Sequence, residues 1–229
     1  MNNKLLVIDV GGTHVKLMIS RNTRRKFNSG PKMTPRDMVG QIKAELKDWK
    51  FDAVAVGFPA PVRDGRIVSD PKHLGKGWVG FNFEKALGKP VRILNDAALQ
   101  ALGSYRGGRM LFLGLGTGLG STLILPNKVL PLELGDLPYR DHRIIEHFLG
   151  RSGLDELGGK EWEREVHFAV EQLKKSLIAD YIVLGGGKAK KLKKRLGGTE
   201  LGHNRNVFLG GVRLWQKDPR TGQPKWKIF

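Results

Sequence analysis

Short apolar runs separated by turn residues are the main pattern in the first hundred positions. Two of these runs, 5–10 and 15–20, are rich in β-branched residues and flank the turn sequence Gly11-Gly12-Thr13. This arrangement predicts two strands joined by a hairpin. Further strands are expected at 21–27, 53–57 and 90–94, and a small hairpin is expected across Asp64-Gly65-Arg66.

Apolar residues at three- or four-residue spacing predict helices elsewhere in the chain. The clearest stripe is Met38, Ile42 and Leu46. Asn95-Asp96 precedes another helix, because amide and acidic side chains favour helix starts. The helices predicted in this way cover 35–49, 97–105, 160–177 and 207–215, with a lysine-rich helix after Gly187.

The layout of segment 5–19 returns at 110–124, MLFLGLGTGLGSTLI, as a strand, a glycine-threonine turn and a strand. Two such units about a hundred residues apart indicate a duplicated α/β architecture with two lobes. A later strand, 181–184, ends in a third glycine turn, Gly185-Gly186-Gly187.

Composition narrows the class of protein. The 229 residues are 40% hydrophobic, which is enough for a substantial core, and there is no cysteine to form disulfides or thiolate metal sites. A net charge of +18 favours polyanionic partners. No apolar window approaches the ~20 residues of a membrane span, so we expect a soluble, cytoplasmic protein without a membrane partner.

The glycine turns are candidate phosphate sites. A turn whose glycines adopt unusual dihedral angles leaves N–H groups pointing outward, and such a nest binds anionic oxygens. Asp9, just before the first turn, would repel phosphate unless a divalent cation lies between them. A tight turn with a surface acid is the alternative. The second turn, Gly116-Thr117-Gly118, favours a clasp that holds a phosphate chain from both lobes, and Gly185-Gly186-Gly187 could add a base or phosphate contact.

Five ordered motifs resemble those of the ROK family of sugar kinases, with the polyphosphate/ATP-dependent glucokinase branch as the best match. They are Asp9-Val-Gly-Gly-Thr13 with Lys16, Asn95-Asp96-Ala, Leu113-Gly-Leu-Gly-Thr-Gly-Leu-Gly-Ser121, Glu133-Leu-Gly and Leu184-Gly-Gly-Gly187. The resemblance implies a two-lobe actin/hexokinase-type (ribonuclease H-like) α/β fold with a central cleft. It also implies an Mg²⁺-dependent hexose kinase, a donor that is ATP or polyphosphate, and a homodimer.

Residue roles follow from the same resemblance. Asp96 matches the catalytic base that accepts the proton of the sugar's primary hydroxyl, whereas its alternative role is to cap the following helix. The expected sugar ligands are Pro59, Asn95, Asp96, Glu133 and Asp136. The expected donor ligands are Asp9, Gly11, Gly12, Thr13, Lys16, Gly116, Thr117, Gly118, Gly185, Gly186 and Gly187, with Asp9 also holding the metal. Trp78 is either a wall for the sugar or ordinary packing.

Departures from the family pattern bear on the substrate. Asp136 stands where relatives usually carry a histidine, so an acceptor-only carboxylate replaces a possible donor. The absence of cysteine removes the structural zinc site of many relatives, and the chain is short. Glucose is the expected hexose.

Basic residues cluster at 21–26 and after the third glycine turn. The second cluster contains Lys188, Lys190, Lys191, Lys193, Lys194 and Arg195. It is either a solvated surface or a track for a long polyanion, and the track would make inorganic polyphosphate a donor beside or in place of ATP. Salt-sensitive binding is expected for such a donor.

The sequence leaves two alternative functions open. A sugar or phosphate sensor without turnover is the first alternative, motivated by Asp136. A nucleic-acid-binding protein, motivated by charge alone, explains neither the glycine turns nor Asp96 and ranks last. We expect a sugar-side lobe over 1–96, completed by helix 206–217, and a donor-side lobe over 97–205.

Overall fold

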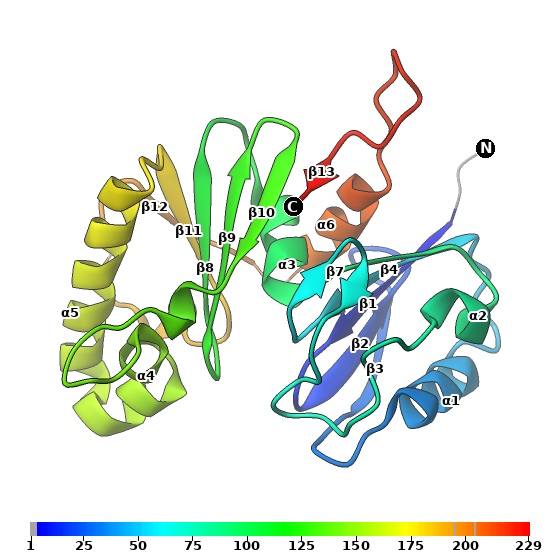
Figure 1. The fold of residues 1–229 in the computed structure, drawn as a ribbon, viewed down its shortest axis with the longest axis horizontal. Helices are drawn as coiled ribbons and strands as arrows, with labels where there is room; N and C mark the ends of the chain where they lie inside the picture. The colour runs from blue at the N-terminus through cyan, green and yellow to red at the C-terminus, as the bar shows by residue number, and fades with distance from the viewer. Residues whose placement is uncertain (1–3, 195, 204) are drawn as a thin grey trace.

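The computed structural model describes residues 4–194, 196–203 and 205–229, so Arg195 of the predicted basic cluster lies outside the described residues. Two mixed β-sheets stand side by side, each with helices on its outer face (Figure 1). Two further helices, α3 (Asp96–Ser104) and α6 (Asn206–Leu214), lie between the sheets.

The first sheet has the strand order β3-β2-β1-β4-β7. Its strands are β1 (Leu5–Val10), β2 (His14–Met18), β3 (Arg24–Asn28), β4 (Ala53–Phe58) and β7 (Val91–Asn95). The first three form an antiparallel meander, and β4 and β7 extend it in parallel. All six residues of β4 are buried, as expected of a central parallel strand.

The second sheet has the order β12-β11-β8-β9-β10-β13. Its strands are β8 (Met110–Leu115), β9 (Leu119–Leu125), β10 (Lys128–Leu132), β11 (Tyr181–Gly185), β12 (Thr199–Leu201) and β13 (Lys227–Ile228). A meander, β8-β9-β10, is again extended by two parallel strands, β11 and β12, and here β13 also pairs in parallel with β10 at the other edge. The repeat predicted from segments 5–19 and 110–124 is therefore confirmed in the topology.

The remaining elements lie on the outer faces or in connections. They are α1 (Pro35–Glu45), β5 (Val62–Arg63), β6 (Arg66–Ile67), α2 (Phe83–Leu87), the 3₁₀ turn η1 (Leu134–Asp136), α4 (Ile145–Leu149), α5 (Arg151–Ser176) and the 3₁₀ turn η2 (Ala189–Lys191). Across the described residues, no helix combines the length and the apolar composition needed to cross a bilayer.

Three sequence predictions need correction in this part of the structure. Helix α1 ends at Glu45 rather than Trp49, and α5 begins at Arg151 rather than Lys160, with a break at Gly158. The lysine-rich helix predicted after Gly187 is wrong, because only η2 forms there. The backbone N–H groups of Lys193 and Lys194 instead donate to Glu163 of α5, which holds this segment outside a helix.

Helix α3 packs so closely on α6 that neither helix tolerates a side chain at the crossing. A methyl group at Gly103 would overlap the backbone oxygen of Asn206, and one at Gly210 would overlap that of Leu99. Next to this crossing, α3 shares one buried cluster with residues of both sheets, including Val7, Ala55, Phe112 and Val183. The crossing therefore fixes α3 relative to both lobes.

Replacing Gly103 with alanine is expected to destabilise the fold strongly, because the new methyl group meets backbone rather than a mobile side chain. We expect the free energy of unfolding to fall by about 3 kcal/mol. Urea unfolding followed by tryptophan fluorescence measures this change.

The matched control is Gly40→Ala in α1, where an added Cβ meets nothing within 4 Å. That change should stabilise the helix by about 0.5–1 kcal/mol. Equal effects of the two substitutions would contradict the proposed tight crossing.

Candidate active site

The carboxyl ends of β1, β4 and β7 bring the predicted donor and catalytic residues to one sheet edge. Asp9 pairs in register with Gly57, and Phe58 pairs with Asn95. A Cβ on Gly57 would lie 3.4 Å from the Cα of Asp96, so the absence of a side chain lets the start of α3 approach β4. Asp96 follows β7, and one strand, β4, separates β7 from the strand that carries Asp9.

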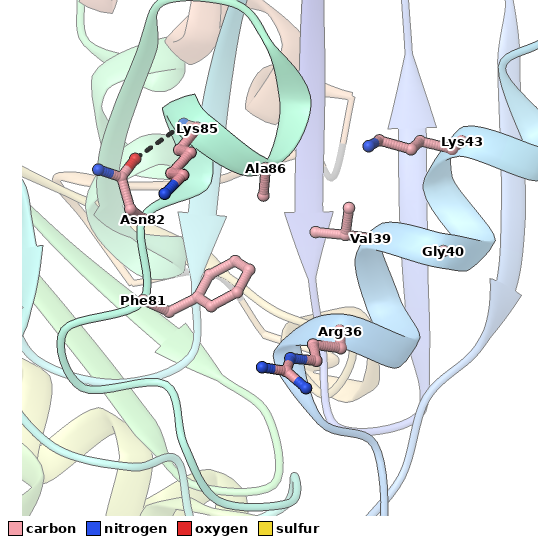
Figure 2. Close-up of a pocket in the computed structure, with 8 residues that line it drawn as sticks. All are labelled: Arg36, Val39, Gly40, Lys43, Phe81, Asn82, Lys85 and Ala86. Atoms are coloured by element: carbon pink, nitrogen blue, oxygen red, sulfur yellow. Dashed lines mark hydrogen bonds between the residues drawn. The ribbon is translucent and has the colours of Figure 1, made fainter.

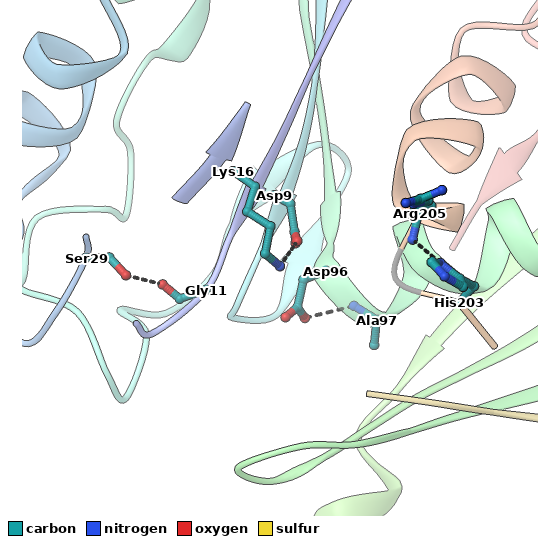
Figure 3. A network of polar contacts seen from close by, with 8 residues as sticks. All are labelled: Asp9, Gly11, Lys16, Ser29, Asp96, Ala97, His203 and Arg205. Carbon is teal, nitrogen blue, oxygen red and sulfur yellow. Dashed lines mark hydrogen bonds and ion pairs between the residues drawn. The ribbon is translucent and has the colours of Figure 1, made fainter. Parts of the chain in front are cut away.

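Asp96 begins α3 with one carboxylate oxygen bonded to the protein. The N–H of Ala97 donates to Asp96 Oδ1 at 2.8 Å (Figure 3). Asn95 Oδ1 also accepts from Ala97, at 2.9 Å, and from Ala98, at 3.3 Å. Asn95 thus caps the helix, and Asp96 is not needed for that role. Among the described residues Asp96 Oδ2 has no protein donor, so it remains available for a ligand.

The pKa of Asp96 is raised to about 7, mainly by burial and next by the nearby negative charge of Asp9. The Ala97 N–H and the Lys16 ammonium oppose this shift, and Glu133 adds to it. A carboxylate with such a pKa exchanges protons near neutral pH, as general bases commonly do.

Asp9 and Lys16 face each other across the β1–β2 hairpin. Lys16 Nζ lies 2.7 Å from Asp9 Oδ2, and the Asp9 side chain is 14% exposed (Figure 3). The pair leaves a carboxylate oxygen and two ammonium hydrogens beside Asp96. This arrangement can contact both an anion and a cation.

The first glycine turn needs small residues for a different reason from the one expected. Gly11 and Gly12 do not have positive φ angles, so the predicted dihedral freedom is wrong. Instead, a Cβ on Gly12 would lie 2.8 Å from His73 Cβ. The Gly11 N–H donates within the turn, to His14 O at 3.0 Å, and is not an outward donor.

In the second glycine turn, too, neighbouring side chains occupy the space that a Cβ would need. A Cβ on Gly118 would overlap the Glu146 carboxylate, and one on Gly120 would lie 2.7 Å from the Cβ of Ala97 in α3. Gly116 is different, since a Cβ there would meet only Gly118 O at 3.9 Å, and Thr117 is exposed. The second lobe thus contacts the start of α3 from the side opposite β4.

The third glycine turn packs on the end of β8. Gly186 has a φ of 81°, and a side chain there would overlap the backbone of Leu115. Lys188 N donates to Leu115 O at 2.9 Å. Gly187 is exposed with open space around it. The second and third turns therefore lie side by side at the same edge of the second sheet.

On the predicted sugar side, Glu133 precedes η1 and Asp136 is its last residue. Partial loss of water contact raises the pKa of Glu133, as does the charge of Asp136, whereas Lys72 lowers it and Glu146 raises it. Pro59 lies in the loop after β4, whose Ala60 O accepts from Asn95 Nδ2 at 3.4 Å. Trp78 is fully buried and stacks on Phe83, so its role is packing and the alternative of a sugar wall is wrong.

Sequence reasoning missed three polar residues at this junction. Glu146 accepts from Leu119 N at 3.0 Å, Lys72 Nζ lies 3.8 Å from Glu146 Oε1, and His73 covers Gly12. The available signal for Glu146 was an isolated acid in the apolar run Ile144-Ile145-Glu146-His147-Phe148. Nothing local marks Lys72, whose importance depends on a contact between lobes.

A separate groove of about 660 Å³ lies between α1 and α2 (Figure 2). Val39, Phe81 and Ala86 give it an apolar lining, and Arg36, Lys43 and Lys85 carry positive charge around it. None of the predicted site residues lines this groove, so we assign it no part in the site.

Metal binding by protein groups alone is not supported for the part of the chain that is described. No three His, Asp or Glu side chains there cluster closely enough to hold an ion. A single carboxylate such as Asp9 does fit Mg²⁺, which usually keeps several waters and takes one or two carboxylates together with substrate phosphates.

The fold and these motifs define a protein of the ROK family. The sequence model of the ROK family matches residues 5–133, so the chain belongs to that family. It is 26% identical over 207 residues to the polyphosphate glucokinase of Mycobacterium leprae, covering 80% of this chain and 63% of that protein. Matches to the first three curated relatives span 28%, 63% and 50% of their lengths.

Solved structures confirm the two-lobe actin/hexokinase-type fold. The inorganic polyphosphate/ATP-glucomannokinase of Arthrobacter sp. strain KM superposes with a TM-score of 0.78 at 23% identity, covering 92% of this chain and 97% of that one. A transcriptional regulator of the ROK family superposes with a TM-score of 0.66 at 14% identity, covering 93% and 79%. The fold thus occurs in both kinases and regulators.

Removal of the Asp9 charge should lower the pKa of Asp96, because two nearby carboxylates disfavour each other's ionised forms. Carboxyl-detected ¹³C NMR titration of the ligand-free protein should find Asp96 titrating near 7 and at lower pH in Asp9→Asn. The control Asp52→Asn, in an exposed turn, should leave the Asp96 curve in place. An Asp96 pKa that is the same in all three proteins would contradict the coupling.

Proposed function

We propose that this chain is a sugar kinase that transfers a phosphoryl group from polyphosphate or ATP to the primary hydroxyl of a hexose, with glucose as the expected substrate. The observation that carries the proposal is the position of Asp96. It lies at the start of α3, beside Asp9 of the first turn, while Gly120 next to the second turn packs on Ala97.

Asp96 acts as the general base in this proposal. The hydroxyl oxygen of the sugar attacks the terminal phosphorus of the donor, and its proton passes to the Asp96 carboxylate. The bond from phosphorus to the leaving oxygen breaks, which releases ADP or a polyphosphate one unit shorter. A pKa of about 7 lets Asp96 take up this proton at neutral pH and return it to water afterwards.

The donor is proposed to lie between the glycine turns of the two lobes. Its proposed ligands are Gly12, Thr13, Lys16, Thr117, Gly118, Gly185, Gly186 and Gly187. The N–H groups of Gly11 and Gly116 are bonded within their own turns, so these two residues shape the turns without donating to the phosphates. Asp9 would hold Mg²⁺, which, when bound, neutralises charge on the donor phosphates. Lys16 adds a fixed positive charge at the same place, 2.7 Å from Asp9.

The sugar is proposed to lie on the other side of Asp96, against Pro59, Asn95, Glu133 and Asp136. Carboxylates accept hydrogen bonds from hydroxyl groups, and Glu133 and Asp136 come from one short turn, so both can reach neighbouring hydroxyls. The cytoplasmic location, the homodimer and the boundaries of the lobes remain predictions.

Asp96→Asn should abolish phosphoryl transfer while keeping sugar binding, because the amide keeps the size of the side chain but cannot accept the proton. We expect kcat to fall by about 10²–10⁴-fold and the Kd of the hexose to change little. For the unsubstituted protein, kcat should fall as pH drops below 7, because protonated Asp96 is inactive as a base.

Coupled enzymatic detection of the hexose phosphate gives kcat, and calorimetry gives the Kd. Asp136→Asn is the matched control, since it removes a carboxylate farther from the attacked hydroxyl and should alter the Kd more than kcat. A kcat of Asp96→Asn close to that of the unsubstituted protein would refute the assigned role.

A sugar sensor without turnover is the second candidate. It is favoured by Asp136 at the position of the usual histidine and by the likeness in fold to a ROK transcriptional regulator. A hexose-dependent rise in melting temperature, with no phosphate transfer from either donor, would support the sensor and exclude the kinase.

Polyphosphate as donor predicts a strong salt dependence. Lys190, Lys191, Lys193 and Lys194 are exposed beside the third turn, and no ion pair of theirs occurs among the described residues. Replacing all four by glutamine should raise the KM for long-chain polyphosphate and flatten its dependence on salt, because each lost cation releases one counterion fewer. The KM for ATP should change less.

The charge-matched control also replaces four lysines by glutamine. They are exposed on the other lobe: Lys47, Lys50, Lys85 and Lys89. That variant should keep both KM values and the salt dependence. Activity with ATP alone, unaffected by salt, would contradict polyphosphate use.

A further inference from the structure

Lys72 reaches from the first lobe toward the second. It lies in the loop between β6 and α2, and its Nζ is 3.8 Å from Glu146 Oε1 of α4. Its neighbours Pro71 and Leu74 are buried, and the backbone of Gly75 is bonded to Met33 O at 2.9 Å. The backbone at Lys72 is therefore anchored, while 74% of its side chain is exposed.

The groups near Lys72 are hydrogen-bond acceptors. Its Nζ lies 3.8 Å from Glu146 Oε1, and it is close enough to Glu133 to lower the pKa of that carboxyl, which Asp136 and Glu146 raise. Glu146 Oε2 is held by the N–H of Leu119, and its carboxylate also lies against Gly118 and Gly135. This fixed carboxylate presents only one oxygen toward Lys72.

The Lys72 ammonium has hydrogen-bond donors that the described residues do not use. A distance of 3.8 Å is too long for a hydrogen bond, and no hydrogen bond from Lys72 to the protein occurs among the described residues. An exposed ion pair of this kind contributes little to stability. Lys72 can therefore exchange its contact with Glu146 for a ligand at little cost.

A sugar hydroxyl needs both kinds of partner, because its hydrogen donates and its oxygen accepts. The predicted sugar ligands Glu133 and Asp136 can only accept when ionised. We infer that Lys72 is a sugar-binding residue that sets hexose specificity by donating a hydrogen bond to a hydroxyl oxygen whose hydrogen is taken by a facing carboxylate. This inference rests on the proposed function, and it supplies from the first lobe the donor that Asp136 cannot provide.

Lys72→Met tests the inference, since it removes the ammonium and keeps most of the aliphatic stem. We expect the Kd of the hexose, measured by calorimetry on the full chain, to rise about tenfold or more, as for the loss of a charged hydrogen bond. The KM of the donor and kcat at saturating sugar should stay within about twofold. Lys72→Arg should recover part of the lost affinity.

Lys76→Met is the matched control. It lies in the same loop, is exposed and changes the net charge equally, and no ion pair of Lys76 occurs within the described ranges. Its Kd should equal that of the unsubstituted protein. All variants should share one melting temperature, which separates loss of a ligand contact from loss of structure.

Singly deoxygenated hexoses locate the hydroxyl. One analogue should bind the unsubstituted protein about tenfold more weakly than the parent sugar, but its loss of affinity should be clearly smaller in Lys72→Met, where only the bond from the hydroxyl to the facing carboxylate remains to be lost. An unchanged hexose Kd in Lys72→Met, or equal deoxygenation losses in both proteins, would overturn the role of Lys72. If no hexose binds the unsubstituted protein, the proposed function fails with it, and this outcome is distinct from the first two.

Discussion

The approach of helix α3 to both sheets is the constraint on which the rest of the structure depends. On one side, Gly57 of β4 lets the backbone of Asp96 come close, and on the other side Gly120 of β9 receives the methyl group of Ala97. At the far end, Gly103 lets α6 cross α3 in direct backbone contact. Because these glycines allow close packing at both ends of α3, the helix has little freedom to slide. The carboxylate at its start therefore stays between the lobes.

The charges around that carboxylate give the junction its chemistry. The side chain of Asp96 is removed from water and lies near Asp9, which is why its pKa reaches about 7, while the Lys16 ammonium limits the rise. The two ends of the junction differ in charge. The first and third glycine turns carry Lys16, which is paired with Asp9, and the exposed lysines of and after η2, whereas Glu133, Asp136 and Glu146 gather near η1 and α4. A phosphate donor suits the first region and a polyol the second.

The sequence predicted the repeated hairpins and the start of α3 because these depend on local patterns. Apolar runs around glycine-threonine turns and an Asn95 cap are visible within ten residues. The reason for the glycines was not predictable, since Gly12 and Gly118 are bare to admit His73 and Glu146, which are distant in the chain. The predicted lysine-rich helix does not form, again because of a residue distant in the chain: Glu163 of α5 binds the backbone of that segment. The contact between Lys72 and Glu146 depends on the packing of two lobes.

The central claim is that this junction catalyses phosphoryl transfer to a hexose. The most direct measurement is a ³¹P NMR time course of the unsubstituted protein with Mg²⁺, a panel of hexoses, and either ATP or long-chain polyphosphate. We expect a new phosphomonoester signal that grows only when both a hexose and a donor are present, together with ADP or shortened polyphosphate. Hexose binding without any phosphomonoester from either donor would contradict it.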